Sequence, residues 1–256
     1  MKRPQSTDMW VLLSDIHHPD YCKPAVAATL SFIERNRAKI KGIVLLGDNM
    51  DCVNISRHTK GKPRLRTRGG IARDFARFDK DILREVEKRI NPGTEKLFFL
   101  GNHEDWLEQW LDENPEFEGI VSFDKSLGLT KRGWEVIQQG EHRRVGKAYL
   151  VHGDAIGSGM HVAKKLVDNF CATAIMGHVH TASMHTKVSQ VKAHDKWVGY
   201  TLPTLGTVSP KYAKGRPNAF VQGIGIIELW KNSFVNVYIP IIIDGRFSYG
   251  GEMYGG

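Results

Sequence analysis

Short apolar runs that end in aspartate, asparagine or histidine limit the fold of this chain more than any other feature of the sequence. Residues 43–46 are all apolar, stop at Gly47 and are followed by Asp48. A short apolar run between chain-breaking residues is typical of a strand buried on both faces of a parallel sheet. The glycine allows a sharp turn, so we expect Asp48 at the carboxyl edge of the sheet, where open α/β sheets bind their ligands.

Four further runs repeat this pattern. They are residues 9–13 before Asp15 and His17, residues 97–100 before Asn102 and His103, residues 148–151 before His152, and residues 173–176 before His178 and His180. Taken singly, a histidine at a strand end is more often structural, and an aspartate after glycine is more often a turn residue. Because the carboxyl ends of parallel strands meet at one edge, the repeated pattern predicts that these side chains converge in one crevice.

The segments between the runs predict helices and loops of a single domain over residues 1–256. Residues 24–33 and 71–90 have apolar residues at helical spacing, which makes the first part of the chain a β-α-β unit. Trp106 and Trp110 predict the buried face of another helix, with stacking on bases as the alternative. Residues 52–70 are expected to form a variable basic loop, residues 112–146 an insertion, and residues 198–202, 223–230 and 234–243 further strands.

The charge distribution favours an anionic partner. The chain has 36 Lys and Arg against 28 Asp and Glu, a net charge of +8. Residues 57–73 contain no acid and carry a block of cations (Arg57, Lys60, Lys62, Arg64, Arg66, Arg68, Arg73). The block is either a solvated surface or a site for the phosphates of a nucleotide or nucleic acid. Arg57 and His58 lie closest to Asp48 in sequence and are the expected phosphate contacts.

Composition also excludes some classes of protein. No apolar run approaches the ~20 residues of a membrane span, and the N-terminal apolar stretch is too short for a signal peptide. The chain has 3 cysteines without CxxC spacing, which favours free thiols in a reducing cytoplasm. We therefore expect a cytoplasmic protein without a membrane partner; its oligomeric state stays open.

The converging side chains form a mixed nitrogen and oxygen set without thiolate. Such a set suits Mn²⁺, Fe²⁺ or Zn²⁺ better than Ca²⁺ or an iron–sulfur cluster. In Asp15-x-His17 and His178-x-His180 an extended backbone would put both side chains on one side, where each pair could reach one ion. A carboxylate between two ions can bridge them, and Asp48 is central. Two ions ~3.5–4 Å apart can clamp a phosphate and activate a water for hydrolysis.

These motifs resemble the signature of the calcineurin-like metallophosphoesterases. The signature reads D-x-H, G-D-x-x-D/N, G-N-H-D/E, H and G-H-x-H. Over residues 9–240 the chain supplies its elements in that order (Asp15 to His17, Gly47 to Asp51, Gly101 to Glu104, His152, Gly177 to His180). The resemblance implies a four-layer α-β-β-α sandwich with mixed parallel and antiparallel sheets, of the small single-domain type found in bacteria and their phages.

The resemblance also implies roles for the site residues and two divalent ions, with Mn²⁺ favoured over Fe, Zn or Ni. Asp15, His17 and His180 would hold one ion, Asn102, His152 and His178 the other, and Asp48 would bridge them. Catalysis would use Asp48 and His103, with a metal-bridging hydroxide as nucleophile and His103 protonating the leaving oxygen. Asn102, His103, Arg57 and His58 would bind the phosphate ester.

The signature departs from one branch of the family. Protein Ser/Thr phosphatases usually carry G-D-x-x-D-R-G, whereas Cys52 and Val53 follow Asp51 here. The G-H-x-H ending is typical of phosphodiesterases, nucleases and small-molecule phosphatases of the family. We therefore expect a phosphodiesterase or nuclease. The alternatives are a phosphomonoesterase acting on nucleotides or on phosphoproteins, and a non-catalytic scaffold.

Overall fold

The strands of the central sheet bury both of their faces, as the apolar runs predict. In β1 (Asp8–Leu13), Met9, Val11 and Leu13 join a core with the helices, whereas Trp10 and Leu12 join a core with the second sheet. This alternation follows from the two-residue period of a strand. The computed structural model describes residues 7–192, 195–210, 215–231 and 234–256.

The first sheet has the strand order β12-β11-β1-β2-β3-β4 within these ranges. Its members are β1, β2 (Ile40–Leu46), β3 (Glu95–Phe99), β4 (Trp134–Ile137), β11 (Gly225–Leu229) and β12 (Val235–Tyr238). Strands β1 to β4 are parallel, β11 pairs antiparallel with β1, and β12 pairs antiparallel with β11. The carboxyl ends of β1, β2 and β3 therefore lie at the same edge.

The second sheet has the order β5-β6-β7-β9-β8 in the described chain. Its members are β5 (His142–Val145), β6 (Ala148–Val151), β7 (Thr173–Met176), β8 (Ser183–Val188) and β9 (Lys196–Thr201). Strands β6, β7 and β9 are parallel, with antiparallel β5 and β8 at the edges. Two small antiparallel pairs complete the chain, β10 (Gln222–Gly223) with β13 (Ile241–Ile242) and β14 (Arg246–Tyr249) with β15 (Glu252–Gly255).

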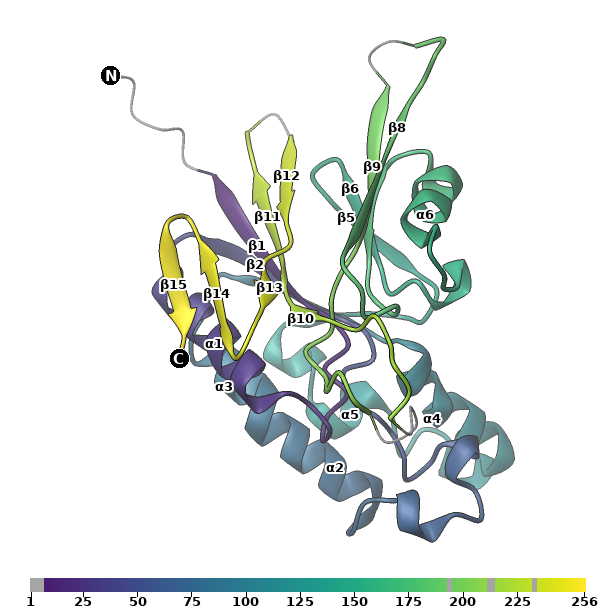
Figure 1. Cartoon of the computed structure of the whole chain (residues 1–256). Helices are drawn as coiled ribbons and strands as arrows, with labels where there is room; N and C mark the ends of the chain where they lie inside the picture. The colour runs from purple at the N-terminus through teal and green to yellow at the C-terminus, as the bar shows by residue number, and fades with distance from the viewer. Residues whose placement is uncertain (1–6, 193–194, 211–214, 232–233) are drawn as a thin grey trace.

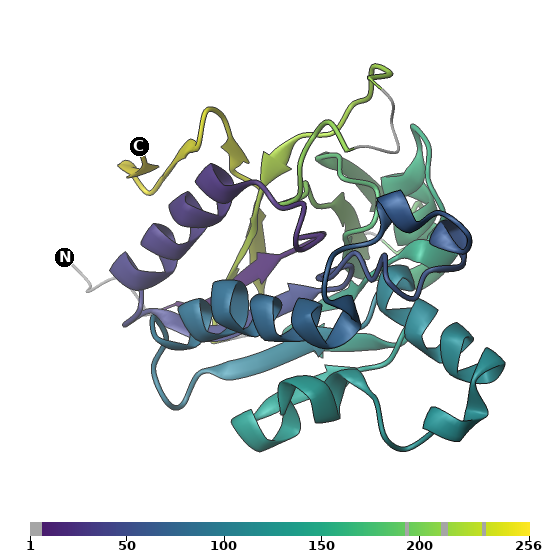
Figure 2. The same ribbon diagram turned by 90° about the horizontal axis from the view of Figure 1, so that it is seen from below.

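Helices cover the outer faces of the two sheets (Figure 1). They are α1 (Lys23–Arg35), α2 (Gly70–Phe78), α3 (Arg84–Glu87), α4 (Asn102–Glu113), α5 (Phe123–Leu127) and α6 (Val162–Phe170). The helix predicted over residues 71–90 is α2 and α3 joined by a π-helical turn, η3 (Asp79–Leu83). In Figure 2, α1 and the helix formed by α2, η3 and α3 lie in front of the first sheet.

Three separate apolar cores show that the molecule has four layers. One core lies between the first sheet and α1 to α3 and includes Phe32 and Phe78. A second lies between the two sheets and includes Val44 and Ile175, and a third joins the second sheet to α6 through Leu166. This arrangement confirms the expected α-β-β-α sandwich with mixed sheets.

The two segments expected to vary connect these layers. Residues 52–70 form a loop with short turns at η1 (Arg57–Thr59) and η2 (Pro63–Leu65). Residues 112–146 contain α5 and also supply β4 and β5, the edge strands of the two sheets. In the described part of the chain, none of the helices combines the length and apolar character needed to cross a membrane.

Candidate metal centre

The loops after β1, β2, β3, β6 and β7 bring the predicted ligands together at one edge of the sheets. Within each of three groups the ligand atoms lie within 4.8 Å of one another. The groups are Asp15, His17 and His180; Asp48, His152 and His178; and His17, Asp48 and His103. Asp48 therefore lies between the residues expected to hold one ion and those expected to hold the other.

In the first group, nitrogen and oxygen atoms face one another closely. Nε2 of His17 lies 3.0 Å from Nε2 of His180, which in turn lies 3.3 Å from Oδ1 of Asp15. Oδ1 of Asp15 is 4.0 Å from Nε2 of His17. Two imidazole nitrogens and a carboxylate oxygen that converge in this way are a donor set suited to a divalent transition metal.

In the second group, Nε2 of His152 faces oxygen atoms. Nδ1 of His152 lies 2.9 Å from the carbonyl oxygen of Leu46, so this nitrogen donates a hydrogen bond and Nε2 of the neutral ring carries the lone pair. That Nε2 lies 3.3 Å from Oδ2 of Asp48 and 3.2 Å from Oδ1 of Asn102. A cation is the natural partner of three such acceptors, so the residues present fit a metal ion.

Backbone strain is concentrated at the same residues. Asp15, His17, Asp48, His178 and His180 have φ values between 47° and 67°, in the left-handed region that non-glycine residues rarely adopt. Strain of this kind costs about 1–3 kcal/mol per residue and collects at functional sites. The extended backbone expected around Asp15 and His17 is therefore wrong, because left-handed turns bring the side chains together. His178 and His180 fall in different groups rather than at one ion.

Two glycines of the signature have steric reasons to be glycine. Gly47 has φ 91°, which confirms the sharp turn expected after β2. A Cβ atom on Gly101 would lie 2.3 Å from Oδ1 of Asp48 and 2.4 Å from its backbone nitrogen. Any side chain at residue 101 would therefore push the Asp48 carboxylate out of its place between the two groups.

Charges in the centre are strongly coupled. Burial lowers the pKa of His17, but its hydrogen bond to Asp51 outweighs burial and raises the pKa to about 9. Burial also opposes charge on His152, while the neighbouring Asp48 raises the pKa of this histidine to about 10. The pKa of Asp48 is held well below its usual range, against burial, by His152 and His103. Without metal, the protonated histidines therefore balance the charge of the carboxylates, and a bound cation would replace the protons of these histidines.

Two carboxylates to which the sequence assigned no role support the centre. Asp51 Oδ1 lies 2.8 Å from Nδ1 of His17 and 3.2 Å from Nδ1 of His103. Buried Glu104 accepts hydrogen bonds from the backbone nitrogens of Asp48, Asn49, Met50 and Gly101 at 2.7–3.0 Å. Their positions inside the Gly47 to Asp51 and Gly101 to Glu104 motifs were the sequence signal that could have identified these two carboxylates.

The residues expected to bind the phosphate lie on the solvent side. Asn102 and His103 are half-buried, whereas Arg57 and His58 are exposed. The His103 ring stacks on Trp106, with centroids 4.1 Å apart and planes at 29°, and the His58 ring lies 5.4 Å from the same indole. Trp106 thus links His103 to the basic loop, and both Trp106 and Trp110 also pack partly against the core.

Comparison with solved structures finds resemblances at low sequence identity. Vacuolar protein sorting 29 from Cryptosporidium parvum has a TM-score of 0.46 at 13% identity, over 98% of this chain and 100% of that one. A dimetal phosphatase from Danio rerio has a TM-score of 0.43 at 10% identity, over 97% of this chain and 96% of that one. The nuclease MPE of Pseudomonas putida has a TM-score of 0.36 at 15% identity, over 90% of this chain and 86% of that one.

No protein-family model matches the sequence, and none of the curated proteins compared with it matches either. The family resemblance therefore stands on the chain's own residues, which are the complete ordered signature, its convergence on one edge and the four layers. In signature and architecture, this chain resembles the calcineurin-like metallophosphoesterases.

Proposed function

We propose that the protein is a dimetal-dependent phosphodiesterase that hydrolyses a nucleotide or nucleic-acid ester. The observation that carries this proposal is the position of Asp48. Its carboxylate belongs to two of the groups of closely spaced metal-type ligands, one shared with His152 and His178 and one shared with His17 and His103. A carboxylate in this position suits a bridge between two ions.

The ligand sets would divide as the family resemblance implies. One ion would be held by Asp15, His17 and His180, and the other by Asn102, His152 and His178, with Asp48 between them. Mn²⁺ is the favoured ion. When bound, the pair would supply Lewis acidity toward the phosphate and a water of lowered pKa.

His103 would handle the proton of the leaving oxygen. Its Nδ1 lies 3.2 Å from Oδ1 of Asp51, while its Nε2 lies 3.9 Å from Oδ2 of Asp48. Asp51 would hold the proton on Nδ1 and aim Nε2 toward the phosphate, where the ring can give a proton to the departing alcohol. The stack on Trp106 fixes the plane of the ring.

The cationic loop favours a substrate with more than one phosphate. Arg57, Lys60 and Arg66 line a cavity that Trp106 also lines, and Trp106 stacks on His103. Cations that line this cavity would attract the neighbouring phosphates of a polynucleotide, with steep dependence on salt.

The test compares two chromogenic esters on protein loaded with Mn²⁺. We expect bis(p-nitrophenyl) phosphate to be hydrolysed with a higher kcat/KM than p-nitrophenyl phosphate, and Asp48→Asn to abolish turnover of both. A clear preference for the monoester would replace the proposal with a phosphomonoesterase. A chain that hydrolyses neither ester and binds no stoichiometric metal would favour the non-catalytic scaffold.

A further inference from the structure

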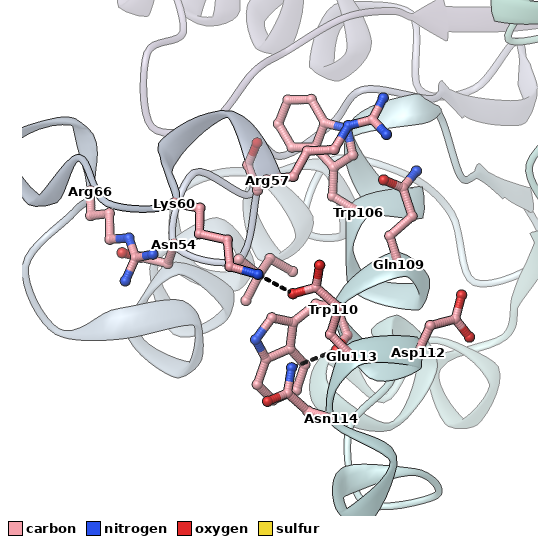
Figure 3. A pocket seen from close by; sticks show the side chains of 12 residues that line it. Asn54, Arg57, Lys60, Arg66, Trp106, Gln109, Trp110, Asp112, Glu113 and Asn114 are labelled. Atoms are coloured by element: carbon pink, nitrogen blue, oxygen red, sulfur yellow. Dashed lines mark hydrogen bonds and ion pairs between the residues drawn. The ribbon is translucent and has the colours of Figure 1, made fainter.

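A cavity of about 580 Å³ lies between the basic loop and helix α4 (Figure 3). Arg57, Lys60 and Arg66 of the loop and Trp106, Gln109 and Trp110 of the helix are among the residues that line it. Lys60 reaches across to Glu113 of α4 in an ion pair of 2.7 Å. The volume lies within the range of small-molecule sites, about 300–1,000 Å³.

The Trp106 ring separates the cavity from His103, the proposed acid. One face of the Trp106 indole covers His103, with 4.1 Å between ring centroids, and Trp106 is also a wall of the cavity. His58 approaches the same indole edge-on at 5.4 Å. A group esterified to a phosphate beside His103 would therefore extend across Trp106 into the cavity.

The walls have the chemistry that recognises a flat ring with polar edges. Trp106 and Trp110 present indoles, and Trp110 is held from another side by Phe117, with centroids 5.2 Å apart. The amide nitrogens of Gln109 and Asn114 donate to Asp105 and to the carbonyl of Trp110, each at 2.7 Å. Within the described ranges, the amide oxygens of these two residues receive no hydrogen bond and remain acceptors for the amino group of a base.

The cations that line the cavity differ in whether they form an ion pair. Lys60 is paired with Glu113, whereas Arg57 and Arg66 are exposed and have no ion-pair partner among the described residues. Indoles, amide acceptors and unpaired guanidinium groups together match a nucleotide, in which a planar base adjoins an anionic phosphate.

We propose that this cavity binds the nucleoside next to the phosphate that is hydrolysed. The base would stack on Trp110 and Trp106, and the following phosphate would contact Arg57 or Arg66. The inference rests on the proposed phosphodiesterase function and adds the recognition of one flanking nucleotide. The cavity would therefore determine which diesters are good substrates.

The kinetic test uses two methyl diesters that differ in the alcohol that leaves beside His103. Methyl thymidine 5′-phosphate carries a nucleoside as its leaving group, and dimethyl phosphate carries only methanol, an alcohol of similar acidity. With the Mn²⁺-loaded chain, we expect kcat/KM to be at least about ten-fold higher for the nucleoside ester. Trp110→Leu and Arg66→Ala should each reduce this ratio several-fold. A ratio near one in the unmodified protein would overturn the proposal.

Arg68→Ala is the matched control, because it removes the same charge from the same exposed loop at a residue that does not line the cavity. We expect Arg68→Ala to leave the ratio of kcat/KM for the two diesters unchanged. An equal loss in Arg66→Ala and Arg68→Ala would show general attraction by the loop instead of recognition in the cavity. Because Arg66 is exposed, its variant stays informative if Trp110→Leu fails to fold.

A binding measurement separates this inference from the proposed function. The dinucleotide thymidylyl-thymidine and dimethyl phosphate are titrated into the Mn²⁺-loaded protein by calorimetry, with Asp48→Asn protein as a second sample if the dinucleotide is cleaved. We expect the dinucleotide to bind at least about ten-fold more tightly, and Trp110→Leu to remove the difference. Equal affinities would overturn the cavity proposal while hydrolysis of bis(p-nitrophenyl) phosphate stands. Tight dinucleotide binding without hydrolysis of any ester would keep the cavity as a nucleotide site and overturn the catalytic function.

Discussion

Asp51 accepts a hydrogen bond from Nδ1 of His17 at 2.8 Å. The same carboxylate oxygen lies 3.2 Å from Nδ1 of His103. One carboxylate thus lies against both an expected metal ligand and the expected acid, although no ion is expected to bind Asp51 itself.

Replacing Asp51 with asparagine should weaken metal binding and turnover together. The amide cannot supply the negative charge that raises the pKa of His17 and holds both rings, and loss of such a supporting contact typically costs 10–100-fold in affinity or activity. Calorimetric Mn²⁺ titration and the kcat of diester hydrolysis measure the two effects. Unchanged values of both would contradict the orienting role.

His103→Ala should separate metal binding from chemistry. The histidine is expected to transfer a proton and to hold no ion, so the variant should retain two Mn²⁺ per chain while kcat falls by about 10²–10⁴-fold. Metal content of the purified variant is measured beside its turnover of bis(p-nitrophenyl) phosphate. Full activity would rule out the acid role, and loss of metal would make His103 a ligand.

The metal-free protein should lose stability as the pH rises above neutrality. His17 and His152 have pKa values raised from 6.5 to about 9 and about 10. A raised pKa in the folded state gives stability that is complete below about pH 6.5 and is lost as the pH passes through 9 to 10. Thermal unfolding in EDTA at pH 6.5, 8 and 10 measures this decline. A melting temperature that rises across this window would contradict it.

The same protons compete with the metal. Mn²⁺ affinity should therefore increase with pH between about 6.5 and 9, and binding should release protons to the buffer. Calorimetry in two buffers of different ionisation enthalpy counts the protons released. An affinity independent of pH would show that these histidines are not ligands.

Gly101→Ala should damage the centre through contact alone. The residue has φ −97° and ψ −172°, which alanine can adopt, but its Cβ would lie 2.3 Å from the Asp48 carboxylate. Overpacking of this kind costs about 1–3 kcal/mol of unfolding free energy, and displacement of Asp48 should also lower Mn²⁺ affinity. Urea unfolding and metal titration measure the two losses.

Gly93→Ala is the matched control, because no heavy atom lies within 4 Å of a Cβ at that residue. It should leave metal affinity unchanged and keep or slightly increase stability. If the two variants behave alike, the crowding around Asp48 does not explain why residue 101 is glycine.

The strands and the edge at which they end could be predicted because their signals are local. Residues 148–151 and 173–176 were expected as strands and are β6 and β7 with the same bounds. The two apolar cores on opposite faces of the strand that contains Val44 follow from the same two-residue strand period. The helix over residues 71–90 was also expected, but not its π-helical turn, which no residue pattern in the segment indicates.

The contacts of the loops could not be predicted because they join residues far apart in the chain. Lys60 meets Glu113, and His58 meets Trp106, only when the loop after β2 folds against α4. The helical spacing of Trp106 and Trp110 predicted a buried face, whereas the structure leaves both half-buried against the core and lining a cavity. Asp51 likewise acquires its role from tertiary contacts with His17 and His103.

The ligand groups are divided between the two sheets: Asp15, Asp48 and Asn102 follow strands of the first sheet, and His152, His178 and His180 follow strands of the second. Neither sheet alone carries a complete set. A chain cut in the connection between β4 and β5 would hold two ions only after its fragments reassociated. The metal content of the sample would then give the fraction of molecules whose two fragments have docked correctly. Elemental analysis would therefore measure assembly.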